Sequence, residues 1–280
     1  MTEYHSTDFD FNDWEQECLE KYTLPPIKFI ENQAKPEEFS DQWDSFFSSH
    51  NSGNFFKPRR YLALEFSKYL NGSHVKRLLE VGCGHGCSMY PLLESCGFEY
   101  IATDYSINAL NILKSHSKYN IKRTISVEHW DVTENPSQSL IDTNPEVVLA
   151  VFALSAIIPE LHIQCFQNMI QLFTHNTNVS NDTRDTNPVI LFRDYAICDM
   201  TMFRHTTRYN TQHLYQRSDG TLAYYFDLEY IRNICVTVGL EVVELEYATV
   251  RVTNRKNNNV MNRVFIHGVF RWNGGYDVVF

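Results

Sequence analysis

The stretch LLEVGCGHG, Leu78 to Gly86, runs from an apolar strand directly into three glycines, Gly82, Gly84 and Gly86. A helical pattern over residues 88–97 follows it. Glycines at such a junction let the backbone approach a ligand closely. In doubly wound sheets ligands sit over the carboxyl ends of the strands, so this stretch predicts a cofactor loop at that edge.

Segments with strand and helix patterns alternate beyond this loop. Alternation at this spacing predicts an α/β fold with a mostly parallel, doubly wound sheet of seven strands and helices on both faces. Two β-rich runs after residue 220 are expected to form an antiparallel hairpin at one sheet edge. The predicted strands cover residues 75–84, 99–106, 125–133, 146–154 and 188–195, the predicted helices 88–97, 107–118, 159–173 and 227–239, and the hairpin 240–256 with 263–272.

Three regions are expected along the chain. Residues 1–38 form an acidic arm with short amphipathic pieces, residues 39–72 a helical segment that caps the cofactor and meets the substrate, and residues 73–280 the α/β domain. Helices are predicted over residues 36–50 and 57–70. The polar stretch 174–188 lacks periodicity, so it predicts a surface insertion without regular structure.

The charge of the chain is unevenly distributed. The formal net charge is −10, yet residues 1–50 hold twelve acids and three lysines, a net of −9. Residues 51–80 hold six bases and two acids, a net of +4. The acidic total argues against a general nucleic-acid binder, whereas the local basic clusters permit a polyanionic partner.

Cysteine use and hydropathy indicate the compartment. The seven cysteines of the 280 residues have no paired spacing, which indicates reduced thiols in a cytosolic protein. No run of eighteen apolar residues predicts a membrane span, and the acidic N-terminal segment is unlike a signal or transit peptide. We therefore expect a cytoplasmic protein, with the nucleus as an alternative, that is monomeric in the absence of its substrate.

Two acids beyond the glycine loop specify the cofactor. Asp104 ends the second predicted strand, where a carboxylate can hold ribose hydroxyls, and Asp131 ends the third, where it can hold an adenine amine. Glu80 precedes the glycines as a common companion. Glycines and acids in this order are typical of an S-adenosylmethionine site in a Rossmann-like class I methyltransferase, whose product is S-adenosylhomocysteine. For each acid alone, a helix cap or a solvated strand end is the alternative.

Two other interpretations of the loop fit less well. An NAD-dependent dehydrogenase needs the third glycine one residue later, where this chain has Cys87. Cys83, His85 and Cys87 invite a metal site, but no second ligand cluster has a suitable spacing, so no metal is expected.

Further segments carry a resemblance to a family. In order they are QWDSFFSSHNSGNFFKPRRYL, LLEVGCGHGCSMYPLL, ATDYS, VFALSAIIPE, ILFRDYAICDMTMFRH, YQRSDGTLAYYF and NRVFIHGVF, and the resemblance covers roughly residues 40 to 272. They resemble the eukaryotic tRNA N3-methylcytidine methyltransferases of the methyltransferase-like group, most closely the cytosolic member that modifies serine tRNA. The resemblance implies 3-methylcytidine formation at tRNA position 32, and seryl-tRNA synthetase as a partner.

The resemblance also implies roles for individual residues. It places the cofactor against Trp43, Phe47, Gly82, Asp104, Asp131 and Val151, and we add Tyr105 and Val132, which follow the two acids. It turns the FFKPR (55–59) and RDY (193–195) segments toward the target base. Phe47 stands where the family commonly has Tyr, so a hydroxyl contact is lost, and Pro58 interrupts the second predicted helix and redirects Arg59.

The strand end VILFRDYAICD, Val189 to Asp199, supplies the chemistry. Buried charge is costly, so Arg193 and Asp194 beside Tyr195 need a reason. Cytosine N3 has a free lone pair and needs no general base, but the methylated ring is cationic, and a carboxylate would stabilise that charge. Asp194 is the candidate, Tyr195 would orient the base, and Arg193 would pair with Asp194 or turn inward to another acid. The alternative is a structural ion pair at a strand end.

The fourth strand supports a ring-nitrogen target. Enzymes that methylate exocyclic amines often carry Asn/Asp-Pro-Pro-aromatic there, whereas this chain has FALSAIIP (152–159), without amide or carboxylate. The base must leave its stack, so Phe55 and Phe56 are candidate stacking surfaces and Arg59 a candidate catalytic contact. The full set expected to contact RNA is Phe55, Phe56, Lys57, Arg60, Arg193, Arg204, His205, Arg208, Arg217, Arg251 and Arg263, with residues 200–225 and 247–271 as the contacting additions.

Two other functions remain open from the residues. The same scaffold could methylate a small molecule or a protein, which tritium transfer into tRNA or protein would distinguish. A non-catalytic partner subunit that binds the cofactor for stability would retain the loop without turnover. The intact Asp194 and glycine loop favour an enzyme.

Overall fold

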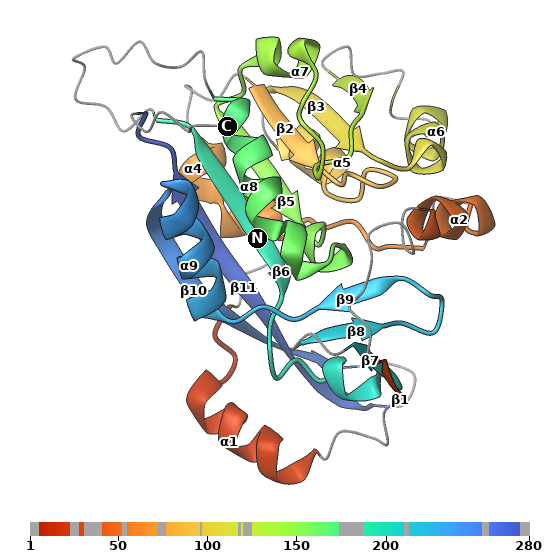
Figure 1. Cartoon of the computed structure of the whole chain (residues 1–280), viewed down its shortest axis with the longest axis vertical. Helices are drawn as coiled ribbons and strands as arrows, with labels where there is room; N and C mark the ends of the chain where they lie inside the picture. The colour runs from red at the N-terminus through yellow and green to blue at the C-terminus, as the bar shows by residue number, and fades with distance from the viewer. Residues whose placement is uncertain are drawn as a thin grey trace.

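The computed structural model in Figure 1 describes residues 6–22, 28–30, 41–51, 55–71, 77–95, 97–116, 119, 125–173, 187–209, 213–253 and 258–274. The predicted insertion at 174–188 falls almost wholly outside these described residues. Every structural statement below concerns the described residues only.

One seven-stranded sheet forms the centre of the molecule, with strand order β10-β11-β6-β5-β2-β3-β4. Neighbouring strands from β6 to β4 pair in parallel, whereas β11 pairs antiparallel with both β6 and β10. The predicted fold class and edge hairpin are therefore confirmed. The strands are β2 (Arg77–Val81), β3 (Glu99–Asp104), β4 (Ile125–His129), β5 (Val147–Val151), β6 (Val189–Tyr195), β10 (Glu241–Thr253) and β11 (Val260–Arg271).

Helices cover both faces of this sheet, and each face has its own apolar core. Alternate residues of a strand point to opposite faces, so Leu78 packs in one core and Leu79 in the other. Full burial of side chains of this size contributes roughly 1.5–3 kcal/mol each. The helices on the Leu78 side include α5 (Met89–Ser95) and α6 (Ile107–Ser115), and those on the Leu79 side α7 (Gln138–Thr143), α8 (His162–Gln171) and α9 (Leu228–Val238).

Helix ends follow the sequence signals. The side chain of Asp227 accepts a hydrogen bond from Tyr230 N at the start of α9, and Gly239 ends that helix with φ +77°. Ser106 caps α6 in the same manner through Ala109 N. Side-chain caps of this kind contribute about 1 kcal/mol each.

The described part of the acidic arm is packed onto the main domain. Asp10 caps helix α1 (Phe11–Lys21), and Trp14 Nε1 donates a 2.9 Å hydrogen bond to the carbonyl of Cys198. Thr7 forms a bridge with Thr249 on β10. The first elements of the chain therefore lie against elements about 180 to 240 residues away, as Figure 1 shows for α1 beneath β10 and β11.

A second, four-stranded sheet of order β1-β7-β8-β9 was not predicted. Its strands are three residues long: β1 (Lys28–Ile30), β7 (Thr207–Tyr209), β8 (Leu214–Gln216) and β9 (Leu222–Tyr224). Figure 1 shows this sheet below α2 (Gln42–Ser49), beyond the end of β6. It brings the expected RNA-contacting segment 200–225 beside the carboxyl edge of the main sheet.

The predicted helix over residues 57–70 is wrong at its start. Residues 57–59 have no regular structure, as Pro58 suggested, because proline lacks an N–H and restricts the residue before it. Helical structure begins only with α3 (Leu62–Glu65) and continues in α4 (Ser67–Leu70). The other predicted helix is confirmed in part as α2, and residues 36–40 of that prediction lie outside the described residues.

A buried charged network lies behind the end of β6. Arg193 is paired with Glu65, and the two side chains are 3% and 1% exposed. Glu65 also accepts from His267 Nδ1 at 2.9 Å, and His267 Nε2 lies 3.1 Å from Glu244. Burial alone would lower the pKa of His267, but the two carboxylates outweigh it and raise that pKa above its ordinary value. The network joins α3 to three neighbouring strands.

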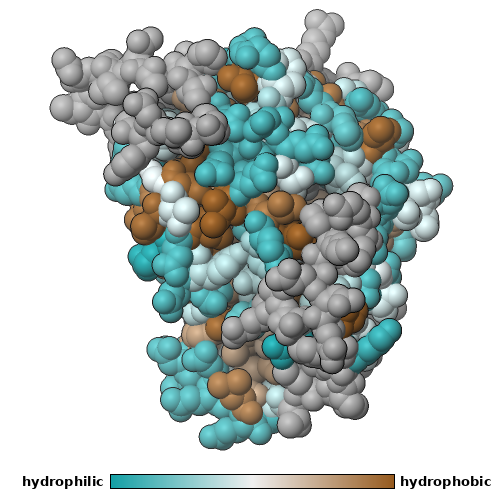
Figure 2. Space-filling view, viewed as in Figure 1, coloured by the Kyte–Doolittle hydropathy of each residue, from teal (hydrophilic) through white to brown (hydrophobic). Residues whose placement is uncertain are grey.

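The surface drawn in Figure 2 is mostly polar, with apolar side chains gathered over α8 and α9. Ile163 on α8 and Val236 on α9 are exposed large apolar residues, and Val236 is 74% exposed. None of the helices in the described part of the chain has the length and hydropathy of a membrane-spanning segment.

Candidate active site

The glycine loop adopts a backbone that only glycine holds without strain. Gly82 and Gly84 have φ values of +65° and +55°. A Cβ at Gly82 would lie 2.8 Å from the Cβ of Ala153, so the loop lies tightly against the end of β5. Asp104, which is 6% exposed, accepts a 2.8 Å hydrogen bond from Gly84 N and another from Ser106 N. The loop and Asp104 are thus in direct contact, whereas the expected contact of each with the cofactor stays a prediction.

Asp104 and Asp131 retain acceptor capacity. Burial raises the pKa of Asp104 to about 6, against the backbone hydrogen bonds and His129, which lower it. Asp131 accepts from Thr133 N and Thr133 Oγ1 through a single oxygen, Oδ1. An ionised carboxylate has about four lone-pair sites, so both acids can accept further hydrogen bonds from hydroxyl or amine groups.

Helix α2 lies over the loop, and its expected role in capping the cofactor stays a prediction. Trp43 N and Asp44 N donate to the hydroxyl of Tyr105 at 3.0 and 3.2 Å, and Asp44 accepts from Asn108 N at the start of α6. A Cβ on Gly84 would lie 3.3 Å from the ring of Phe47. The indole nitrogen of Trp43 is buried without a hydrogen-bond partner among the described residues. The hydroxyl of Tyr105 thus positions α2 by accepting hydrogen bonds from the main chain of that helix.

The remaining expected cofactor residues lie beneath and beside the loop. Glu80 is fully buried and accepts a 2.7 Å hydrogen bond from Tyr100, and burial raises the pKa of Glu80 to about 7. Val151 and Val132 are also buried, at the ends of β5 and just after β4. Glu80 thus supports the loop from below.

A Gly84→Ala substitution tests the loop. The alanine backbone must keep the left-handed φ of Gly84, which costs roughly 1–2 kcal/mol. Its methyl group must also push the ring of Phe47 aside. Cofactor affinity should fall by about tenfold or more, as measured by calorimetry with S-adenosylhomocysteine. Gly97→Ala is the matched control, because nothing lies within 4 Å of a Cβ there and its φ is unexceptional. Equal affinities of the two variants would contradict the role of Gly84.

Asp194, at the end of β6, is held by the segment after β5. Its Oδ2 accepts from Ser155 N at 2.9 Å and its Oδ1 from Tyr195 N at 2.8 Å. The residue is fully buried, and burial raises the pKa of Asp194 to about 6, against the hydrogen bonds from Ser155 and the charge of Arg217. Ser155 belongs to the short 3-10 helix η3 (Leu154–Ala156). Arg193 does not pair with Asp194. The other expectation, that Arg193 turns inward to another acid, is confirmed, since it pairs with Glu65 on the other face of the sheet.

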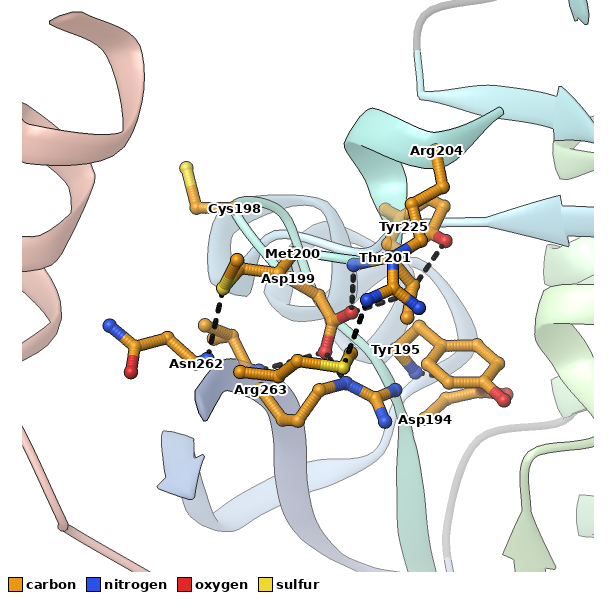
Figure 3. A network of polar contacts seen from close by, with 12 residues as sticks. Asp194, Tyr195, Cys198, Asp199, Met200, Thr201, Arg204, Tyr225, Asn262 and Arg263 are labelled. Atoms are coloured by element: carbon orange, nitrogen blue, oxygen red, sulfur yellow. Dashed lines mark hydrogen bonds and ion pairs between the residues drawn. The ribbon is translucent and has the colours of Figure 1, made fainter. Parts of the chain in front are cut away.

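Tyr195 lies among aromatic rings and two cations. The guanidinium of Arg217 lies 5.6 Å from its ring centroid and 5.8 Å from that of Trp43, so Arg217 spans from the capping helix to β6. Arg263 approaches the Tyr195 ring at 5.9 Å. Phe152, with a φ of +55°, has its ring 4.8 Å from that of Tyr195. Figure 3 shows Asp194 and Tyr195 side by side at this strand end.

Arg59 reaches the same region from the irregular segment that follows Phe56. Its Nη1 donates to Ser88 Oγ at 3.0 Å and to the carbonyl of Val151 at 3.2 Å. Its guanidinium lies 5.0 Å from the ring of Phe152. Arg59 is therefore brought to the cofactor loop and the end of β5, and its expected contact with the base stays a prediction.

An aromatic group forms the rim beside α2. Phe56 stacks on His85 of the glycine loop at 5.9 Å, and Phe55, which is 53% exposed, meets Phe56 and Phe46 edge to face. Burial and the charge of Arg59 lower the pKa of His85, so this ring is neutral at neutral pH. The exposed Phe55 has the surface that base stacking requires.

The structure separates the basic residues expected at RNA. The prediction that Arg193 contacts RNA is wrong, because its side chain is buried in a pair with Glu65 and has no surface for RNA. His205 is uncharged, since burial lowers its pKa to about 4 and its Nε2 lies 2.7 Å from the Tyr225 hydroxyl. Arg204, Arg217 and Arg263 lie near the end of β6, half-buried Arg208 lies on β7, exposed Arg60 pairs with Glu94, Lys57 is exposed, and Arg251 contacts Phe9.

Three participants were missed in the sequence. The main-chain N–H of Ser155, the left-handed Phe152 and the buried Asp199 all contribute to this region. Asp199 closes the very stretch that contains Asp194, so a second acid four residues after Tyr195 was the available signal. Nothing in the sequence marks a main-chain donor or a positive φ at phenylalanine.

A hollow of about 340 Å³ lies between α2 and α6, lined by Phe47, Ser48, Asn51, Asn108, Asn111, Ile112 and Ser115. It shares only Phe47 and Asn108 with the residues described above. The glycine loop, the two acids and Asp194 therefore define the candidate site better than this hollow does.

Comparison with known proteins gives a consistent result. A family described as a methyltransferase domain matches residues 55–245. The tRNA N(3)-cytidine methyltransferase METTL6 of Rattus norvegicus is 31% identical over 256 residues, which cover 88% of this chain and 83% of that protein. The tRNA N(3)-methylcytidine methyltransferase trm141 of Schizosaccharomyces pombe is 31% identical over 247 residues, 84% of this chain and 93% of that protein. An SAM-dependent methyltransferase from Anabaena variabilis shares the fold with a TM-score of 0.62 at 14% identity, covering 89% and 99% of the two chains.

Proposed function

Because this chain belongs to the family of tRNA N3-cytidine methyltransferases, we propose that Asp194 holds the target cytosine while its N3 is methylated. The enzyme uses S-adenosylmethionine, which supplies an electrophilic methyl group when bound. The observation that carries the proposal is the place of Asp194. It is a carboxylate with a raised pKa at the same sheet edge as the glycine loop.

The residues present fit this cofactor. A Cβ at Gly84 would lie 3.3 Å from the ring of Phe47, so a glycine is what lets α2 pack closely over the cofactor loop. Asp104 and Asp131 would hold the ribose hydroxyls and the adenine amine through their remaining lone pairs. The orphan indole N–H of Trp43 gives a buried donor on the capping helix.

Asp194 binds the exocyclic amine of the cytosine and opposes the charge that develops on its ring. With a pKa of about 6 the carboxyl is mostly ionised at neutral pH. Its two backbone hydrogen bonds fix its direction, so little reorganisation is needed during the reaction. Because Asp194 is fully buried, a side chain that covers it must move before the base can enter. Arg217 is the candidate, because its charge acts on the pKa of Asp194.

The segment after β5 supports a ring nitrogen as the target. Its contribution to the site is the N–H of Ser155, which is already used to hold Asp194. Residues 152–159, FALSAIIP, have no side-chain amide or carboxylate that could bind an exocyclic amine. That contact is therefore left to Asp194. Tyr195 and Phe152 would flank the extruded base by stacking.

The finer assignments are also proposals. We propose serine tRNA as substrate, position 32 as the target, seryl-tRNA synthetase as a partner that compensates for the low positive charge, and the cytosol as the compartment. Binding to tRNA should weaken steeply with salt, because phosphate contacts release counterions. Activity that does not respond to added synthetase would remove that partner.

The test is a methylation assay with purified protein. Serine tRNA transcripts, threonine tRNA transcripts and a protein extract are incubated with tritiated cofactor, and digested RNA is examined for 3-methylcytidine by mass spectrometry. We expect label in serine tRNA at cytidine 32. Label in protein alone, or no turnover despite cofactor binding, would overturn the proposal.

A further inference from the structure

Asp199 is a fully buried carboxylate to which the proposed reaction gives no task. Its Oδ1 accepts from Thr201 N at 2.8 Å and from the Thr201 hydroxyl. Its Oδ2 accepts from Arg263 Nε at 2.8 Å and from Val264 N at 2.9 Å. Figure 3 shows Asp199 at the centre of this network, between the end of β6 and β11. Four hydrogen bonds to one carboxylate fix its position firmly.

This arrangement holds Arg263 by one nitrogen only. The Nε of Arg263 is bound to Asp199, while its two terminal amino groups have no hydrogen-bond partner among the described residues. Its side chain is 19% exposed, and the guanidinium lies over the rings of Phe265 and Tyr195 at 5.0 and 5.9 Å. The two free amino groups of the rigid Arg263 guanidinium are therefore held beside Tyr195, the residue proposed to flank the base.

A second guanidinium lies close by. Arg204 Nη2 donates to the sulfur of Met261 at 3.0 Å, and a thioether is a weak acceptor. No acid pairs with Arg204 within the described ranges. Met261 and Arg263 are two residues apart on β11, so their side chains share one face of the strand. Two guanidinium groups with one carboxylate leave an excess positive charge there.

The chemistry of the reaction decides what this charge serves. A cytosine ring that becomes cationic is disfavoured beside two guanidinium groups unless an anion neutralises them. An extruded nucleotide carries such an anion with it, because its own backbone phosphates stay at the mouth of the pocket. Arginine forks match phosphate oxygens with paired hydrogen bonds.

We propose that Arg263 and Arg204 bind a backbone phosphate next to the target cytidine, and that Asp199 is the positioning residue that aims Arg263. The inference rests on the proposed function for the identity of the target nucleotide. It adds a phosphate subsite on β11 and at η5 (Met202–Arg204), separate from the base contacts of Asp194.

The experiment pairs a protein change with a neutralised phosphate. A synthetic anticodon stem–loop carries a methylphosphonate on either side of the target cytidine, and affinity is measured by anisotropy with protein saturated with S-adenosylhomocysteine. Arg263→Met should weaken binding of unmodified RNA by about tenfold and lower the salt slope by about 1. One methylphosphonate should cost the unaltered protein a similar factor and cost Arg263→Met almost nothing.

Controls separate this subsite from general effects. Arg232→Met removes an exposed cation on α9 and should retain the full methylphosphonate effect. Arg204→Met and Asp199→Asn should each reduce that effect, with unchanged melting temperature as the condition for interpreting Asp199→Asn. If a methylphosphonate costs Arg263→Met as much affinity as it costs the unaltered protein, the two losses are independent and the proposal is wrong. Because binding is measured without turnover, absence of 3-methylcytidine would contradict the proposed function and leave this result standing.

Discussion

An Asp194→Asn enzyme is expected to lose about 10²–10³-fold in methyl transfer to tRNA while it retains cofactor affinity. The amide keeps the size of the side chain but removes the charge that opposes the developing cation on the base. Single-turnover rates report the loss directly, and calorimetry with S-adenosylhomocysteine reports the retained affinity. Because Asp194 touches Ser155 and Tyr195 rather than the glycine loop, the two measurements should separate.

The pH profile of the unaltered enzyme provides a second readout of the same group. Burial raises the pKa of Asp194 to about 6. The ionised form is the active one, so kcat/KM should fall as the pH drops through about 6 and level off above it. Asp104, proposed to hold the cofactor, also has a pKa raised to about 6, so the profile is measured for tRNA at saturating cofactor. Under that condition the Asp194→Asn enzyme should lack this inflection.

A matched control is Asp142→Asn, which changes an exposed carboxylate on α7 and should leave the rate and the pH profile unaltered. Undiminished turnover in Asp194→Asn would remove Asp194 from the mechanism. An equal loss of cofactor binding would assign it to the structure of the site instead.

Breaking the buried pair behind β6 should produce the largest loss of stability. Arg193→Met leaves Glu65 charged, 1% exposed and dependent on His267 alone. Removing one partner of a buried pair costs about 3–5 kcal/mol, because the other charge stays uncompensated. Urea denaturation should show this loss in the free energy of unfolding.

The double variant Glu65→Met/Arg193→Met identifies the cause. Replacing both charges by apolar groups removes the unpaired carboxylate, so most of the lost stability should return. Arg60→Met breaks the exposed pair with Glu94 and should cost no more than about 1 kcal/mol. If Arg193→Met costs no more than Arg60→Met, the network does not stabilise this region as the burial implies.

The sequence was most informative for site residues that lie at the ends of neighbouring parallel strands. Gly82 and Gly84 follow one buried strand and Asp104 ends the neighbouring one, and parallel strands end at one edge, so their proximity could be predicted. For Arg193 the sequence left two options open, Asp194 or an unidentified acid, because its true partner Glu65 is 128 residues away on a short helix. The pairing depends on how α3 packs against β6, and no local pattern encodes it.

The small sheet and the capping contacts were beyond prediction for a different reason. Strands of three residues, such as β8 and β9, are too short to show a period of two. Arg217 follows β8 directly, and only the hairpin brings it over Trp43 and Tyr195. The composition of residues 200–225 indicated a contact surface, whereas its geometry required tertiary structure.

The docking of α1 has a consequence for synthesis on the ribosome. Trp14 contacts Cys198 and Thr7 pairs with Thr249, so α1 leaves the ribosome well before the segments that it packs against are translated. Contacts of such long sequence separation form late and slowly. During translation the apolar face of α1 is left without its partner, which makes the nascent chain a candidate client for chaperones until β10 and β11 have emerged.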